Sequence, residues 1–236
     1  MTCLRVSSLS KIVLAGLAGL TVTIAGCQTT SSPTTPASEA TADATSSASA
    51  IAQATPIRVG TAAPDFTGID SNGTSHKLSD FRGKTVVLEW TNHQCPYTVK
   101  HYESGNMQAL QKEATGKDVV WLSIVSSASG LQGYVTPEQA NELTTSRKAS
   151  PTAVILDSEG KIGKLYTART TPHMFVIDAN GVLQYMGAID DKPTANQEDI
   201  AGAQNYVQSA LTQVIAGQPV ATASTQPYGC TVKYGS

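Results

Sequence analysis

The chain of 236 residues lacks the short motifs that mark several large enzyme classes. It contains no glycine-rich phosphate loop, no Gly-x-Ser-x-Gly elbow and no His-Glu-x-x-His zinc motif. It also has no basic run, since 16 Lys and Arg are set against 18 Asp and Glu. Phosphate-loop, serine-hydrolase and zinc-peptidase chemistry are therefore not indicated, and neither is nucleic-acid binding.

Cysteine is scarce, and its four copies lie far apart in the chain. They are Cys3, Cys27, Cys95 and Cys230. The stretch "CPYT" has Thr98 where a Cys-x-x-Cys pair would place its second thiol. Since no close cysteine pair is present, each thiol has to be interpreted from its own surroundings.

The N-terminus has the features of a lipoprotein signal. Arg5 and Lys11 precede an apolar run over 12–26, which is too short to span a bilayer comfortably. The run ends in "IAGC" at 24–27, which resembles a bacterial lipobox. We therefore expect a signal peptide at 1–26 and a lipid on Cys27. Gln28 replaces the aspartate of inner-membrane retention, so we expect the periplasmic side of the envelope, on the outer membrane rather than the inner.

The next segment, 27–57, is rich in Ser, Thr and Ala and contains no aromatic residue. Such a composition cannot bury enough apolar surface to fold, so it predicts a flexible tether. From 58 onward, apolar runs at 85–91, 118–126, 152–157 and 173–179 predict buried strands, and 181–189 follows the turn "DANG" as a hairpin partner. Helical spacing predicts helices at 96–114, weakened at Ser104-Gly105, and at 136–149 and 196–217. The alternation predicts an α/β domain at 58–217, with a mixed sheet covered by helices on both faces and a tail at 218–236.

Three segments together resemble a known family. Cys95-Pro96 lies between a strand and a helix, "RTTPHMFVID" at 169–178 places Pro172 before a strand, and 64–90 runs "PDFTGIDSNGTSHKLSDFRGKTVVLEW". The combination resembles the thioredoxin-fold redoxins, especially the peroxiredoxin-like alkyl hydroperoxide reductase/thiol-specific antioxidant family. The resemblance implies a thioredoxin-like fold in which a cis Pro172 faces Cys95. Leu88 and Asn92 stand where peroxiredoxins carry a proline and a hydrogen-bonding threonine, a role that Asn92 or Thr171 would have to take.

Cys95 is the expected nucleophile. If it caps the helix that begins at Pro96, free backbone N–H groups and the helix dipole favour its thiolate. His93, Lys100 and Arg169 are further candidates for stabilising the charge, and Thr98 lies in the same turn. Glu89 sits inside the preceding apolar strand, where dithiol thioredoxins carry a buried acid. A buried Glu89 would move protons to and from the sulfur, whereas a Glu89 at a sheet edge would simply be solvated.

The resemblance implies a peroxiredoxin-like peroxidase that needs no cofactor. Cys95 would reduce a small peroxide, and the resulting sulfenic acid would condense with Cys230, within the chain or between subunits. An external dithiol would then restore both thiols.

Two alternatives remain open at this stage. The first is a thiol–disulfide exchange protein that acts on other envelope proteins. The second is a copper-binding module that gathers His93, Cys95, His101 and His173, although Cu(I) prefers more sulfur ligands. We expect His101 to be solvated, His173 to lie beside Pro172, and the acids of "AIDDKP" at 188–193 to form a solvated turn rather than an ion site.

Overall fold

The computed structural model describes residues 57–235. The predicted signal peptide, the predicted lipidation site Cys27 and the predicted tether up to residue 56 lie outside the described residues. Within the described range, no helix is both long enough and apolar enough to cross a membrane.

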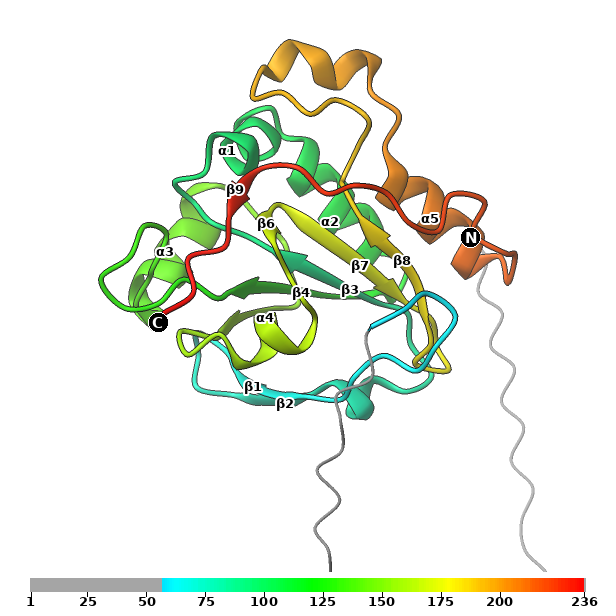
Figure 1. Cartoon of the computed structure of the whole chain (residues 1–236), viewed down its shortest axis with the longest axis horizontal. Coiled ribbons are helices and arrows are strands. Elements are labelled where there is room, and N and C mark those ends of the chain that lie inside the picture. Colours follow the sequence, from blue (N-terminus) through cyan, green and yellow to red (C-terminus); the bar gives the residue numbers. More distant parts are fainter. Residues whose placement is uncertain (1–56, 236) are drawn as a thin grey trace, which may run out of the picture. The chain divides into compact units, whose positions relative to one another are not determined.

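A five-stranded sheet forms the centre of the domain (Figure 1). Its strands are β3 (Val86–Trp90), β4 (Val120–Val125), β5 (Ala153–Leu156), β7 (His173–Ile177) and β8 (Leu183–Gly187). They lie in the order β5-β4-β3-β7-β8, with β3, β4 and β5 parallel and β7 antiparallel to both neighbours. Every residue of β3, β4 and β7 is buried, which explains their near-continuous apolar runs. The predicted mixed sheet and the 181–189 hairpin are confirmed.

Helices cover both faces of this sheet, as expected. On one face, α1 (Pro96–Glu103), α2 (Asn106–Thr115) and α5 (Tyr206–Ile215) share a core with Val87, Trp121 and Val176. On the other face, α4 (Lys161–Leu165) packs with the segment that holds β1 (Thr67–Ile69), β2 (Ser75–Lys77) and the 3-10 helix η1 (Leu78–Phe81). The remaining helix, α3 (Pro137–Ser146), packs through Ala140 against Val125.

Two predicted helices take a different form. The helix expected at 96–114 is divided into α1 and α2 at Gly105, whose φ of 78° interrupts the helical geometry. A single helix over 196–217 was wrong. Residues Gln197–Gly202 form the 3-10 helix η2, which buries no residue, and α5 begins anew where the Asn205 side chain accepts the N–H of Gln208 at 2.9 Å. The cap and the lack of a buried face on η2 explain the break.

The residues after α5 return to the domain. Strand β9 (Cys230–Thr231, red in Figure 1) pairs antiparallel with β6 (Thr170–Thr171), directly before Pro172. Val232 enters the same core as the sheet and is only 6% exposed. The predicted tail therefore lies along the domain, and 218–235 belong to the same compact unit.

Gly229 allows this close approach, and its substitution gives a test of the pairing. Its φ is 131°, and a Cβ added there would lie 2.1 Å from the carbonyl oxygen of Thr171. We expect Gly229→Ala to lower the free energy of unfolding by about 2–3 kcal/mol, measured by urea denaturation, because both strain and the clash oppose docking. Gly73→Ala is the matched control, since Gly73 has a φ of 80° but no atom within 4 Å of the added Cβ. Equal losses in the two variants would show that the contact with Thr171 is unimportant.

Candidate active site

Cys95 caps α1, as predicted, and Pro96 is the first residue of that helix. Its side chain is fully buried. The thiol donates to the carbonyl oxygen of Thr171 at 3.0 Å, and the sulfur accepts the backbone N–H of Cys230 at 3.3 Å. The Thr171-Pro172 peptide is cis, as the resemblance implied, and Pro172 is buried beside Thr171. The helix cap and the cis-proline loop therefore meet at one sulfur.

Cys230 lies in contact with Cys95 although the two are 135 positions apart in the chain. The pairing of β9 with β6 brings them together, because it sets Cys230 opposite Thr171, which contacts Cys95. Both thiols are free, and Cys230 is only partly buried. The structure thus contains a reduced pair in which one sulfur is enclosed and the other is partly accessible.

The surroundings move the pKa values of the two thiols in opposite directions. Burial by itself would raise the pKa of Cys95. Hydrogen bonds from the side chains of Cys230 and Thr171 and from the backbone N–H of Thr98 outweigh burial, so the pKa of Cys95 lies below its usual value. The Thr171 carbonyl opposes this shift, since it accepts only from a protonated thiol. Burial, the hydrogen bond to Cys95 and the charge of Cys95 raise the pKa of Cys230 to about 12. Cys95 is therefore the more easily ionised thiol of the pair, and Cys230 is the one that more readily keeps its proton.

Glu89 is fully buried in the central strand, so its alternative placement at a sheet edge was wrong. Its carboxylate accepts four hydrogen bonds, from Tyr102 Oη (2.8 Å), Gln111 Nε2 (3.1 Å), Trp121 Nε1 (2.8 Å) and Ser123 Oγ (2.9 Å). These donors come from α1, α2 and β4. Among the described residues, no hydrogen bond joins Glu89 to Cys95. The carboxylate therefore ties two helices to the sheet, and proton transfer by Glu89 stays a prediction.

Asn92 and His93 shape the loop before Cys95 without contacting its sulfur through their side chains. The Asn92 carbonyl accepts the N–H of Cys95 at 3.0 Å, and its side chain accepts the N–H of Gln94 at 2.9 Å. The His93 carbonyl accepts from Arg147 at 2.9 Å. Burial and the nearby Arg147 charge lower the pKa of the His93 ring. Asn92 is thus occupied by the loop rather than free to replace the peroxiredoxin threonine.

The remaining supporting residues lie in three different settings. Thr98 is buried in the first turn of α1, and its hydroxyl has no hydrogen-bond partner among the described residues. Arg169 is exposed, and its carbonyl accepts the N–H of Val232 at 3.0 Å. Lys100 faces Asp190, with 3.8 Å between Nζ and Oδ2. The expectation that Lys100 stabilises the Cys95 thiolate was therefore wrong.

The proposed copper ligands do not converge. His101 contacts Asn106 and Tyr228, and the ring of His173 accepts the backbone N–H of Arg169 at 3.4 Å. Across residues 57–235, no three His, Cys, Asp or Glu side chains are grouped so as to hold a metal.

His101 and Asp190 are both buried, so the expected solvated histidine was wrong, and the expected solvated turn was wrong for Asp190 but not for the exposed Asp191. Sequence reasoning missed this pairing and the part that Tyr228 takes in it. One signal for the burial of Asp190 was present in the sequence, since Asp190 directly follows the apolar run at 181–189.

The thiolate of Cys95 provides a direct test of this electrostatic arrangement. We expect the 240 nm absorbance difference between the reduced protein and its Cys95→Ser variant to titrate below the usual thiol pKa. Cys230→Ala removes the hydrogen bond from the Cys230 thiol, keeps the one from its backbone N–H, and should move this titration to higher pH. Since folding lowers the pKa of Cys95, its contribution to stability is present above the unfolded pKa and is lost as the pH falls through the folded value. An unchanged midpoint in Cys230→Ala would show that the Cys230 thiol does not lower the pKa of Cys95.

Glu89→Gln separates a structural role from proton transfer. We expect it to lower the free energy of unfolding by about 1–3 kcal/mol, because an amide NH₂ cannot accept from the donors that now surround the carboxylate. The Cys95 titration should keep its midpoint, since no contact connects the two groups. Glu113→Gln is the control, as Glu113 lies on the surface of α2 and pairs with Lys117 at 2.7 Å. A shifted Cys95 titration would instead support proton transfer by Glu89.

Comparison with solved structures supports the fold. A hypothetical protein from Sinorhizobium meliloti 1021 matches with a TM-score of 0.68 and 24% identity, covering 76% of this chain and 96% of that chain. An uncharacterized conserved protein from Geobacillus kaustophilus matches with a TM-score of 0.64 and 22% identity, covering 75% and 93%. At these identities the likeness concerns the fold alone, which is a thioredoxin-like mixed α/β fold.

Comparison with sequence relatives and with a family model identifies the family of the chain. The chain is 27% identical over 128 residues to the thiol-disulfide oxidoreductase ResA of Geobacillus thermodenitrificans, covering 50% of this chain and 74% of the relative. It is 26% identical over 129 residues to ResA of Bacillus subtilis, covering 50% and 72%. The family model described as Redoxin matches residues 58–205, a range that includes the sheet, Cys95 and the cis-proline. The chain therefore belongs to the Redoxin family.

Proposed function

We propose that the domain is a thiol–disulfide oxidoreductase that exchanges disulfides through Cys95 and Cys230. The observation that carries the proposal is the meeting of these two thiols, with the N–H of Cys230 on the sulfur of Cys95 at 3.3 Å. Relatives named as thiol-disulfide oxidoreductases support it. The lowered pKa of Cys95 supplies the thiolate that such chemistry needs.

In the first half of the cycle, the reduced protein transfers two electrons to a partner disulfide. The Cys95 thiolate attacks one partner sulfur, which forms a mixed disulfide and releases the other partner sulfur as a thiolate that takes up a proton. Cys230 then loses its proton and attacks the Cys95 sulfur. This step forms the Cys95–Cys230 disulfide and releases the second partner thiol.

An external dithiol completes the cycle by reversing these electron transfers. In the described structure, Cys230 is partly exposed whereas Cys95 is enclosed. The incoming thiolate therefore reaches the Cys230 sulfur more easily. Cys95 is also the better leaving group, because its pKa is the lower of the two. Access and leaving-group quality favour the same point of attack.

Peroxide reduction is the second candidate, since a thiolate with a neighbouring thiol also suits a peroxidase. Two observations place it behind disulfide exchange. Asn92 is engaged in its loop, and the Thr171 hydroxyl donates to the Cys230 carbonyl at 3.4 Å, so neither replaces the peroxiredoxin threonine in the described structure. The named relatives are disulfide oxidoreductases.

The cellular setting follows from the N-terminal sequence. We place the domain in the bacterial envelope, held at the membrane by a lipid on Cys27 and separated from it by the tether at 27–57. The support is the "IAGC" motif at the end of the apolar run, together with the advantage that an oxidising compartment gives to a redox pair of thiols.

Trapping with oxidised glutathione tests the exchange reaction. We expect the reduced full-length protein to form the Cys95–Cys230 disulfide, and Cys230→Ser to accumulate glutathione on Cys95, because the second step is then blocked. Cys95→Ser should react at least about tenfold more slowly at Cys230, because burial still raises the pKa of that thiol in the variant. Peptide mass spectrometry assigns each product to its cysteine and separates these thiols from Cys3 and Cys27.

A parallel reaction with hydrogen peroxide distinguishes the two candidates. Faster formation of the Cys95–Cys230 disulfide with glutathione disulfide than with equimolar peroxide supports exchange. If peroxide instead forms this disulfide about a hundredfold faster, peroxide reduction replaces disulfide exchange as the proposed function. If neither oxidant modifies Cys95, both redox functions are excluded.

A further inference from the structure

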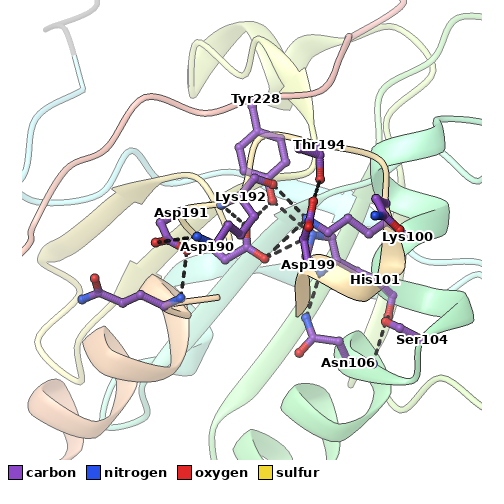
Figure 2. Close-up of polar contacts among 12 residues, drawn as sticks. Lys100, His101, Ser104, Asn106, Asp190, Asp191, Lys192, Thr194, Asp199 and Tyr228 are labelled. Carbon is purple, nitrogen blue, oxygen red and sulfur yellow. Dashed lines mark hydrogen bonds and ion pairs between the residues drawn. The ribbon is translucent and has the colours of Figure 1, made fainter. Parts of the chain in front are cut away.

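A buried polar cluster around Asp190 takes no part in the chemistry described so far (Figure 2). It joins Lys100 and His101 of α1 with Asp190, which follows β8, and with Tyr228 of the C-terminal segment. The side chains of Lys100 and His101 are 0% exposed, and that of Asp190 is 2% exposed. Three separate stretches of the chain therefore meet around one enclosed carboxylate.

Asp190 is the centre of this cluster. Its Oδ1 accepts the Tyr228 hydroxyl and the backbone N–H of Lys192, the latter at 2.9 Å. Its Oδ2 lies 3.8 Å from Lys100 Nζ and 3.9 Å from His101 Nε2. Lys100 Nζ also donates to the Lys192 carbonyl at 2.8 Å. One oxygen of Asp190 thus faces the helix of Cys95, and the other holds the segment that carries Cys230.

The hydrogen bonds of the cluster have a defined direction. Burial and the Lys100 charge lower the pKa of His101 to about 4 in spite of Asp190, so the ring is neutral. Asn106 Nδ2 donates to His101 Nδ1 at 2.8 Å, which leaves the proton on Nε2 to be donated to the Tyr228 hydroxyl at 3.3 Å. Tyr228 then donates to Asp190. Removing the Tyr228 hydroxyl would therefore remove both hydrogen bonds, the one from His101 and the one to Asp190.

The cluster lies close to both thiols along the chain. Cys95 caps the helix that carries Lys100 and His101, and Tyr228 comes two positions before Cys230. The Tyr228 ring also contacts α1 itself, with its centroid 5.8 Å from that of Tyr97 and 5.6 Å from Lys100 Nζ. Burying an ion pair has a high desolvation cost and adds little stability by itself. The pair of Lys100 and Asp190 instead holds α1 and the segment after β8 in one relative position.

The C-terminal segment that Tyr228 anchors also encloses Cys95. The sulfur is fully buried, and Cys230, which donates to it, belongs to the segment that Tyr228 anchors. A partner disulfide cannot reach Cys95 while this segment is in place. Opening has to break the hydrogen bond from Tyr228 to Asp190 and the pairing of β9 with β6, whereas Lys100 and Asp190 can stay together.

We propose that Asp190 and Tyr228 are positioning residues that hold the C-terminal segment closed over Cys95, and that release of the Tyr228–Asp190 hydrogen bond admits the partner disulfide. The proposal rests on the exchange function proposed above and adds its gating step. Asp190 keeps its place against α1 through Lys100, and Tyr228 is the part that moves. Closure afterwards returns Cys230 to Cys95 for the second step of the exchange.

Alkylation of Cys95 in the reduced full-length protein measures this opening. We expect Tyr228→Phe to raise the rate of iodoacetamide modification at Cys95 about tenfold, followed by peptide mass spectrometry, because the lost hydrogen bond to a charged acceptor exists only in the closed form. The phenyl ring keeps the contact with Tyr97, so the segment still has its apolar anchor. The formation of a Cys95–glutathione mixed disulfide should accelerate by the same factor.

Tyr166→Phe is the matched control, since it removes a buried hydroxyl that donates to the Pro64 carbonyl at 2.6 Å, away from Asp190. It should lower the free energy of unfolding and leave Cys95 alkylation at the wild-type rate. The proposal is overturned if Tyr228→Phe alkylates like the wild type, or if Tyr166→Phe accelerates alkylation equally through general unfolding. Alkylation needs no disulfide partner, so this result is independent of failure in the glutathione experiment.

Discussion

The hydrogen bond from the backbone N–H of Cys230 to the sulfur of Cys95 is the interaction on which the rest of the site depends. It exists because β9 pairs with β6 immediately before the cis-proline, which sets Cys230 opposite Thr171. The same pairing encloses the Cys95 sulfur, helps to lower its pKa and keeps Cys230 protonated beside it. The most reactive form of the nucleophile is thus stabilised in the conformation that a partner cannot reach. A thiol of this kind needs a movable cover, and the C-terminal segment is suited to be one.

Two buried carboxylates show how differently the same group is used in one domain. Glu89 is surrounded by four uncharged donors from two helices and one strand, so it strengthens the packing of the sheet against α1 and α2. Asp190 instead combines a lysine, a histidine and a tyrosine from segments that need not move together. The first arrangement is confined to the core of the fold, whereas the second includes a segment at its surface. This difference is the reason that we connect Asp190, rather than Glu89, with the control of Cys95.

Much of the fold could be predicted from the sequence because its strands are buried on both faces. Runs such as 85–91 and 173–179 are apolar over most of their length, and this pattern is typical of strands in the interior of a covered sheet. The prediction failed at 196–217, where helical spacing continued through a stretch that buries none of its residues. The Asn205 cap, a local polar interaction, decided where that helix begins. Solvation of His101 and Asp190 was also predicted wrongly, because each residue is polar alone and becomes stable inside only through the other and through Lys100 and Tyr228.

The sequence by itself determined the chemistry at one end of α1. A cysteine followed by proline at a strand-to-helix junction favours the N-cap position, because the fixed φ of proline suits the first residue of a helix, and Cys95 does occupy that position. Only the tertiary structure decided which second thiol meets Cys95, what covers the pair and which groups hold that cover. Contacts between residues 95, 171, 190 and 228 depend on strand pairing and on mutual burial across distant segments. No local pattern of residue types encodes such contacts, because each is favourable only when its partners are already in place.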